Sequence, residues 1–256
     1  MTSNTGWLTL LAVTLAGCNP AGSPRPEDAA ATRPSETQPR QTDASRRPSA
    51  INEARTSVTA HMKDHLSRAT VIRDALVMGH LKRAKPPAKY LAEHWPEKVL
   101  ETWMPFVRGL RHSAGEVDRA SDLEAASRGA ASLALACGQC HQALDDGPTF
   151  PSPPAPAAGD DAGPRMQRHR WAADRLWEGV VQPSAERWAE GVEGLQRLPN
   201  CQDDHGGEQL SEAIEAARNA SERVRNQAKT ATDLPDRARL YGELLVTCNA
   251  CHSAGC

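Results

Sequence analysis

The 256-residue sequence is poor in aromatic residues and has almost no net charge. Aromatic residues make up 4%, with only two Tyr and two Phe, so each hydrophobic core must be small or be completed by something other than side chains, such as a buried cofactor. Thirty basic residues against 32 acidic ones give a formal net charge of −2, which argues against a strongly basic nucleic-acid-binding protein. The sequence also lacks a glycine-rich phosphate loop and a nucleophile elbow.

The apolar stretch near the amino terminus, Leu8 to Leu15, is too short to span a bilayer as a helix but suits the core of a signal peptide. It ends in Leu15-Ala16-Gly17-Cys18, which resembles the lipobox of bacterial lipoproteins. The resemblance implies that residues 1–18 form a signal peptide, that Cys18 is acylated, and that the protein is anchored to a membrane in the periplasm. The segment departs from the usual pattern because residues 1–6 contain no Lys or Arg; ordinary cleavage or a buried Cys18 is the alternative.

Residues 19–50 contain six Pro among Ser, Thr, Ala and charged residues. Such a segment cannot bury enough apolar surface to offset its loss of conformational entropy on folding. We therefore expect residues 19–50 to form a disordered tether.

The rest of the chain predicts helices and no sheet, because sustained two-residue alternation of β-branched residues is absent. Apolar residues instead recur at spacings of three and four, as on one face of an α-helix. Landmarks repeat along the chain: Cys137 and Cys248 are separated by 111 residues, as are Asp122 and Asp233. The sequence thus predicts an all-α fold of two tandem antiparallel four-helix bundles, 51–142 and 164–256, joined by a Pro-rich linker at 143–163.

Each predicted bundle ends in the pattern Cys-x-x-Cys-His, the attachment site of c-type haem. Two thiols three residues apart on a helix can bond to the two vinyl groups of one porphyrin, and the adjacent imidazole then ligates the iron. We expect two covalently attached haem c groups, held by Cys137 and Cys140 with His141, and by Cys248 and Cys251 with His252.

Two other chemistries use paired cysteines. Four cysteines can bind one zinc ion, but here that site would have to bridge separate bundles. A thioredoxin-type dithiol needs a strand before its motif and a helix after it, whereas a predicted helix precedes both motifs and only four residues follow His252.

The position of the motif at the end of the fourth helix resembles the cytochrome c′ class, over about residues 51–142 and 164–256. That resemblance implies a haem-binding cytochrome of the bacterial periplasm. Members of the class usually keep the iron five-coordinate. This sequence departs from them because both first helices carry Met-x-x-His on the predicted inward face. His65 and His169 are therefore the candidates for a second axial ligand, with Met62 and Met166 next and open pockets as the alternative.

We expect an electron-transfer protein that exchanges electrons with redox proteins of the periplasm or membrane, and not an enzyme. A gas-binding or sensing haem protein with five-coordinate iron is the alternative, and no paired acid and base beyond the candidate ligands supports a peroxidase. Cys201 and Cys256 remain after the lipid and haem assignments; in an up-down-up-down bundle they end helices at the same pole, so we expect them to form a disulfide.

Overall fold

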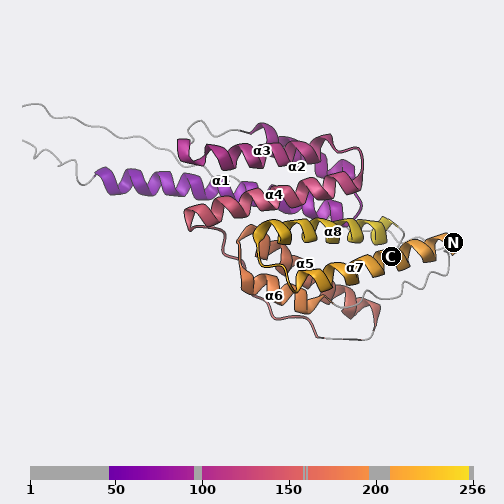
Figure 1. The fold of residues 1–256 in the computed structure, drawn as a ribbon. Helices are drawn as coiled ribbons and strands as arrows, with labels where there is room; N and C mark the ends of the chain where they lie inside the picture. Colours follow the sequence, from indigo (N-terminus) through magenta and orange to yellow (C-terminus); the bar gives the residue numbers. More distant parts are fainter. Residues whose placement is uncertain (1–45, 95–99, 158, 160, 196–207, 254–256) are drawn as a thin grey trace, which may run out of the picture. The chain divides into compact units, whose positions relative to one another are not determined.

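The computed structural model describes residues 46–94, 100–157, 159, 161–195 and 208–253. Over these residues the chain is α-helical and contains no strand, which confirms the all-α prediction (Figure 1). One short 3-10 helix, η1 (Glu101–Trp103), precedes α3. The α-helices are α1 (Arg46–Val77), α2 (Leu81–Glu93), α3 (Met104–Arg119), α4 (Leu123–Leu144), α5 (Ala162–Val181), α6 (Ala185–Gly194), α7 (Glu208–Ala228) and α8 (Leu234–Ser253).

Helix α1 begins earlier than the sequence pattern predicts. The structure places residues 46–50 in the helix, although they belong to the segment that we expected to be a disordered tether. These residues include Pro48, which lies in the first turn, where a missing backbone N–H removes no intrahelical hydrogen bond. The signal peptide and residues 19–45 of the expected tether lie outside the described residues.

The two helices that carry the Cys-x-x-Cys-His motifs begin in the same way. The Asp122 carboxylate accepts a hydrogen bond from the Ala125 backbone N–H at 2.7 Å, and the Asp233 carboxylate accepts one from Asp236 at 2.7 Å. An aspartate at this position satisfies a backbone donor that the first helical turn leaves without a partner. The repeated aspartate, Asp122 and Asp233, is therefore a repeated helix cap, which sets the start of α4 and α8.

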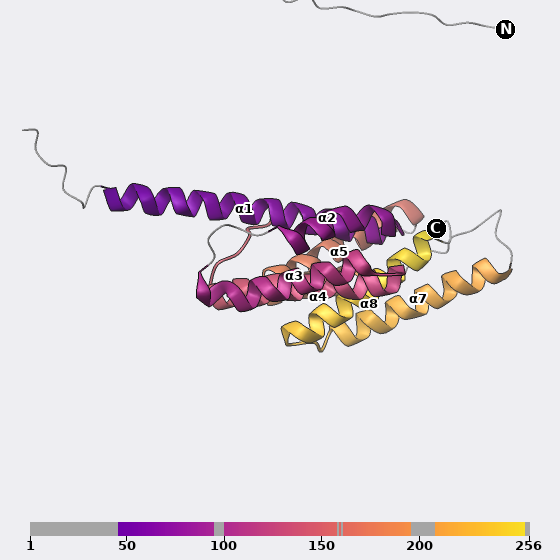
Figure 2. The ribbon, with the colours of Figure 1, turned by 90° about the horizontal axis from the view of Figure 1, so that it is seen from above.

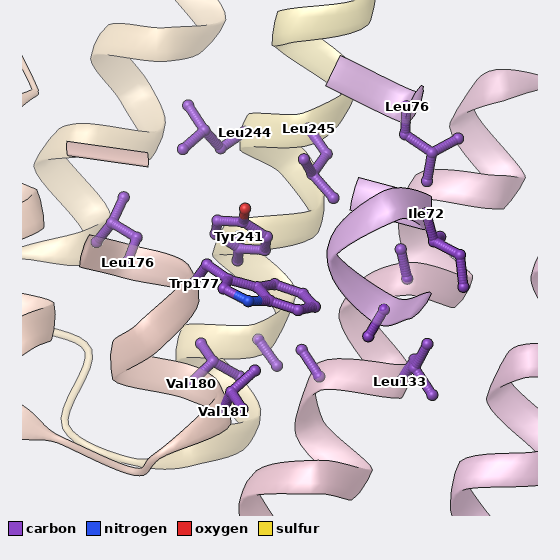
Figure 3. Close-up of a cluster of buried hydrophobic side chains, with 14 of the residues drawn as sticks. Ile72, Leu76, Leu133, Leu176, Trp177, Val180, Val181, Tyr241, Leu244 and Leu245 are labelled. Carbon is purple, nitrogen blue, oxygen red and sulfur yellow. The ribbon is translucent and has the colours of Figure 1, made fainter. Parts of the chain in front are cut away.

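The helices of the two predicted bundles share one hydrophobic core. Residues 49–256 form one compact unit, and its core cluster combines Ile72 and Leu133 from the first half with Trp177 and Tyr241 from the second (Figure 3). Helix α4 packs against α8 and α5 as well as against α3. The predicted limits 51–142 and 164–256 thus do not separate two compact bodies, because each half buries apolar surface against the other.

Helices α4 and α8 lie side by side and run antiparallel (Figures 1 and 2). The early part of α4 meets the late part of α8, where the Asn249 side-chain amide donates to the Ser127 hydroxyl at 3.1 Å. Gly138, near the end of α4, instead lies beside Leu234 at the start of α8. The two Cys-x-x-Cys-His motifs are consequently at opposite ends of this helix pair.

The Pro-rich segment between the halves is held against the helices by side-chain hydrogen bonds. Arg168, Trp171 and Arg175 of α5 donate to the carbonyl oxygens of Pro156, Pro153 and Pro151, at 2.9, 3.1 and 3.0 Å. Arg187 of α6 donates to the Ser152 hydroxyl at 2.7 Å. Residues 150–156 of the segment we expected to be a linker are therefore docked on α5 and α6.

None of the described helices has an apolar segment long enough to cross a membrane.

Candidate haem attachment sites

The first motif occupies the last two turns of α4. Cys137 and Cys140 are one helical turn apart, both half-buried, and their thiols are free. The imidazole of His141 lies with Nδ1 at 2.7 Å from the carbonyl oxygen of Val181, at the end of α5. A histidine that donates Nδ1–H to a backbone carbonyl has its ring orientation fixed and its Nε2 available as a metal ligand.

The end of α5 also packs closely against α4 at this motif. A side chain at Gly138, between the two cysteines, would collide with the carbonyl oxygen of Val180. The absence of a Cβ at this position therefore lets the two helices approach each other. This contact brings the second half of the chain to the first motif.

The second motif occupies the last turns of α8. Cys248 and Cys251 are buried with free thiols, and His252 is half-buried. Arg218 of α7 lies close enough to Cys251 for its positive charge to favour the thiolate, although burial outweighs this effect and raises the pKa of Cys251. Burial likewise raises the pKa of Cys248 to about 12, so this thiol is protonated at neutral pH.

Helix α5 brings His169 to the second motif. Burial, together with the nearby His252, lowers the pKa of His169 to about 4, so the imidazole is neutral. Its Nδ1 is buried and has no hydrogen-bond partner among the described residues. The sequence predicted His169 as a partner of the second motif. In the structure it lies close enough to His252 for the charge of one imidazole to affect the pKa of the other.

The corresponding residue of the first half, His65, has different neighbours. Its ring centroid lies 4.0 Å from that of His61, which in turn lies 5.7 Å from the ring of His94. Burial, followed by the charge of His61, lowers the pKa of His65 to about 4, and both ring nitrogens are buried without a partner in the described part of the chain. The strongest electrostatic neighbours of His65 are His61, Asp64, His94 and Arg68, and His141 is not among them.

Sequence reasoning did not single out His61 and His94 as members of this cluster. They have no counterpart at the equivalent positions of the second half, so repetition could not reveal them. The one available signal was the spacing of His61 and His65, four residues apart on one face of a helix. His94 joins them only because α2 packs antiparallel to α1.

Of the two methionines in the Met-x-x-His pairs, Met62 differs from the prediction. Met62 is 39% exposed, so it does not lie on the inward face of α1 as expected. Met166 is half-buried on the first turns of α5. An exposed thioether is a poor candidate for a ligand in a closed pocket, which leaves His65 ahead of Met62 in the first half.

The geometry bears on the two rival uses of the cysteines. Because the motifs lie at opposite ends of α4 and α8, their four thiols cannot meet around one zinc ion. Both motifs end helices, and the described residues contain no strand to support a thioredoxin-type site. Burial also raises the pKa of Cys137 to about 12, whereas reactive dithiols need a lowered pKa.

No group of three or more His, Cys, Asp or Glu side chains arranged to hold a metal ion by themselves occurs within the described ranges. Cys18, Cys201 and Cys256 lie outside those ranges, so the lipid anchor and the Cys201–Cys256 disulfide stay predictions. Comparison with protein-family models, with curated proteins and with solved structures gave no match.

Proposed function

We propose that the protein is a di-haem c-type cytochrome that transfers electrons. The observation that carries the proposal is the second site, where the buried His169 is near enough to His252 for their charges to interact and the thiols of Cys248 and Cys251 are free. A neutral buried imidazole with an unpartnered nitrogen costs free energy in an apolar environment, and ligation of iron would satisfy it. The residues at this site thus fit a covalently attached haem.

In this proposal the protein residues bind and orient two cofactors. Cys137 and Cys140 hold one porphyrin and Cys248 and Cys251 hold the other, each through two thioether bonds. When bound, haem supplies an iron that changes oxidation state by one electron. His141 and His252 are the proximal ligands, and the Val181 carbonyl keeps the His141 ring in place.

A second candidate function, gas binding, is favoured at the first site only. His65 lies in a cluster with His61 and His94, and these two rings are among its strongest electrostatic neighbours. With His65 held in that cluster, His141 would be the one protein residue binding the iron, and a haem held this way would bind nitric oxide or carbon monoxide. The two sites would then differ: His169 and His252 ligate one iron, and His141 alone ligates the other.

Location and partners are also part of the proposal. The Leu15-Ala16-Gly17-Cys18 sequence supports export to the periplasm and attachment to a membrane by acyl chains on Cys18. Redox proteins of that compartment or membrane are the proposed partners.

The experiment is mass spectrometry and absorption spectroscopy of the full chain after maturation in a cytochrome c assembly strain. Two haems should remain attached under denaturing conditions, and Cys137→Ser with Cys140→Ser should remove one of them. His169→Ala should convert one haem from low-spin to high-spin, whereas His80→Ala, at an exposed site before α2, should change nothing. A protein without haem adducts that instead binds zinc would refute the proposal.

A further inference from the structure

Two large aromatic side chains lie in the middle of the core, between the two motifs. Trp177 of α5 and Tyr241 of α8 are 2% and 1% exposed, and their ring centroids are 5.6 Å apart with planes inclined at 46°. Figure 3 shows Trp177 beside Tyr241, with aliphatic residues of α1, α4, α5 and α8 around them. The sequence has few aromatic residues, yet these two large rings lie against each other in the hydrophobic core.

The Trp177 end of this pair leads to the first motif. Val181 follows Trp177 by one turn of α5, and its carbonyl oxygen lies 2.7 Å from His141 Nδ1. The carbonyl oxygen of the preceding residue, Val180, packs against Gly138. A continuous path of covalent bonds and close contacts therefore joins Trp177 to the first motif.

The Tyr241 end leads to the second motif. Cys248 follows Tyr241 by seven residues, so the two lie two turns apart on the same face of α8. They are close enough for a charge on Cys248 to affect the pKa of Tyr241, which burial raises far above its ordinary value.

The motifs themselves are far apart. Gly138 of the first motif lies beside Leu234, and Cys248 is 14 residues farther along α8, which corresponds to about 21 Å at the rise of an α-helix. The rate of electron tunnelling falls steeply with distance, and it falls fastest where the path crosses a gap between atoms that are not bonded. Two packed aromatic rings midway between the motifs reduce the length of such gaps along the path.

We propose that Trp177 and Tyr241 form the bridge through which electrons tunnel between the two haem attachment sites. The inference rests on the proposed di-haem function and adds a role for residues that bind no cofactor.

The surroundings of the two rings indicate that they conduct without being oxidised themselves. Oxidation of Trp or Tyr is eased by loss of a proton, yet Trp177 Nε1 and the Tyr241 hydroxyl have no hydrogen-bond partner in the described part of the chain. The Arg73 guanidinium also lies 5.6 Å from the Trp177 ring, where its charge opposes a cation on the indole. An unpartnered buried polar group normally destabilises a core, so Phe would have been the less costly residue for packing alone.

The test measures internal electron transfer in the two-haem protein. A pulse of radiolytically produced electrons reduces the protein partially, and optical spectroscopy follows redistribution between the sites. Trp177→Leu and Tyr241→Leu should each slow redistribution several-fold, Trp177→Phe should give an intermediate rate, and Tyr241→Phe should keep the wild-type rate. Trp188→Leu is the control, because Trp188 of α6 is similarly buried and touches α5 through its backbone and Cβ at Gly179, while its indole Nε1–H donates to the Ala228 carbonyl of α7 at 2.9 Å.

Electron paramagnetic resonance supplies a second readout. The signals of both haems should be unchanged in every variant, and wild-type protein should show no tryptophan or tyrosine radical after oxidation. Redistribution at the wild-type rate in the Leu variants would overturn the bridge; if those variants do not fold, an unslowed Trp177→Phe would do so. Absence of haem from the wild-type protein would refute the proposed function instead, so the two failures are distinguishable.

Discussion

Glu178 is a carboxyl group buried outside both motifs, in the centre of a cluster of arginines. Its Oε1 accepts a hydrogen bond from Arg175 at 2.5 Å, and Oε2 lies 3.8 Å from the Arg187 guanidinium. Burial raises the pKa of Glu178 to about 7, against the opposing effect of Arg175 and Arg187. The native protein therefore binds a proton at this residue more tightly than the unfolded chain does.

The raised pKa predicts a loss of stability as pH rises. The contribution of Glu178 is fully present below its unfolded pKa of about 4.5 and disappears as the pH passes 7, a change of roughly 3 kcal/mol in the free energy of unfolding. Glu178→Gln should remove this slope in urea unfolding measured from pH 4 to 8.

The quantity to follow is the difference in the free energy of unfolding between Glu178→Gln and wild type at each pH. His65 and His169, whose pKa values burial lowers to about 4, change stability in the opposite direction over pH 4 to 6.5. They are present in both proteins and cancel in the difference. A variant whose stability runs parallel to that of wild type at every pH would show that Glu178 is ionised throughout.

At the scale of elements, the docked segment 150–156 depends on donors that α5 presents at successive turns. A proline-rich chain has few backbone N–H groups but keeps its carbonyl oxygens, so only side-chain donors such as those of Arg168 and Trp171 can hold it. The aromatic ring of Trp171 and the arginines beside it resemble, in their chemistry, the surfaces that recognise polyproline helices. The segment is therefore an ordered part of the fold.

Weakening these hydrogen bonds should release the segment without unfolding the protein. Each contributes about 1 kcal/mol, so Arg168→Met with Trp171→Phe should lower the melting temperature only slightly. Limited proteolysis by proteinase K, read by mass spectrometry, should show faster cleavage within residues 147–161. Arg170→Met is the matched control, since Arg170 is the exposed neighbour on the same helix; equal cleavage in all three proteins would contradict docking by these donors.

At the scale of the whole molecule, the two halves stabilise each other. The Arg73 guanidinium of α1 lies 3.1 Å from the Asp174 carboxylate of α5, and the turn at Gly79 packs against Ser253 of α8. Gly79 has a φ of +71°, which favours glycine at this turn. These contacts add to the apolar surface that α4, α5 and α8 bury between the halves.

Separated halves should therefore fold poorly. Residues 49–146 and 147–256, produced as two chains, should each show reduced helicity by circular dichroism and no cooperative thermal transition, because each exposes half of a shared core. Mixing them should restore helicity and yield a 1:1 complex by size-exclusion chromatography. Two independently folded halves that remain separate on mixing would show that the fold is two bundles after all.

The sequence by itself determined the helices, their order and the positions of both motifs. Helical spacing and aspartate caps act locally, so the starts of α4 and α8 at Leu123 and Leu234 could be predicted from neighbouring residues. Repetition pointed to His169, which the structure brings to His252.

Only the tertiary structure decided how the halves pack, because that depends on contacts between residues distant in sequence. Sequence repetition implied two equivalent bundles, but α4 and α8 bury their apolar faces against each other, which merges the cores and sends the motifs to opposite ends. The same packing surrounds His65 with His61 and His94 while placing His169 beside His252. The two matching motifs thus acquire different surroundings, because different helices pack around each of them.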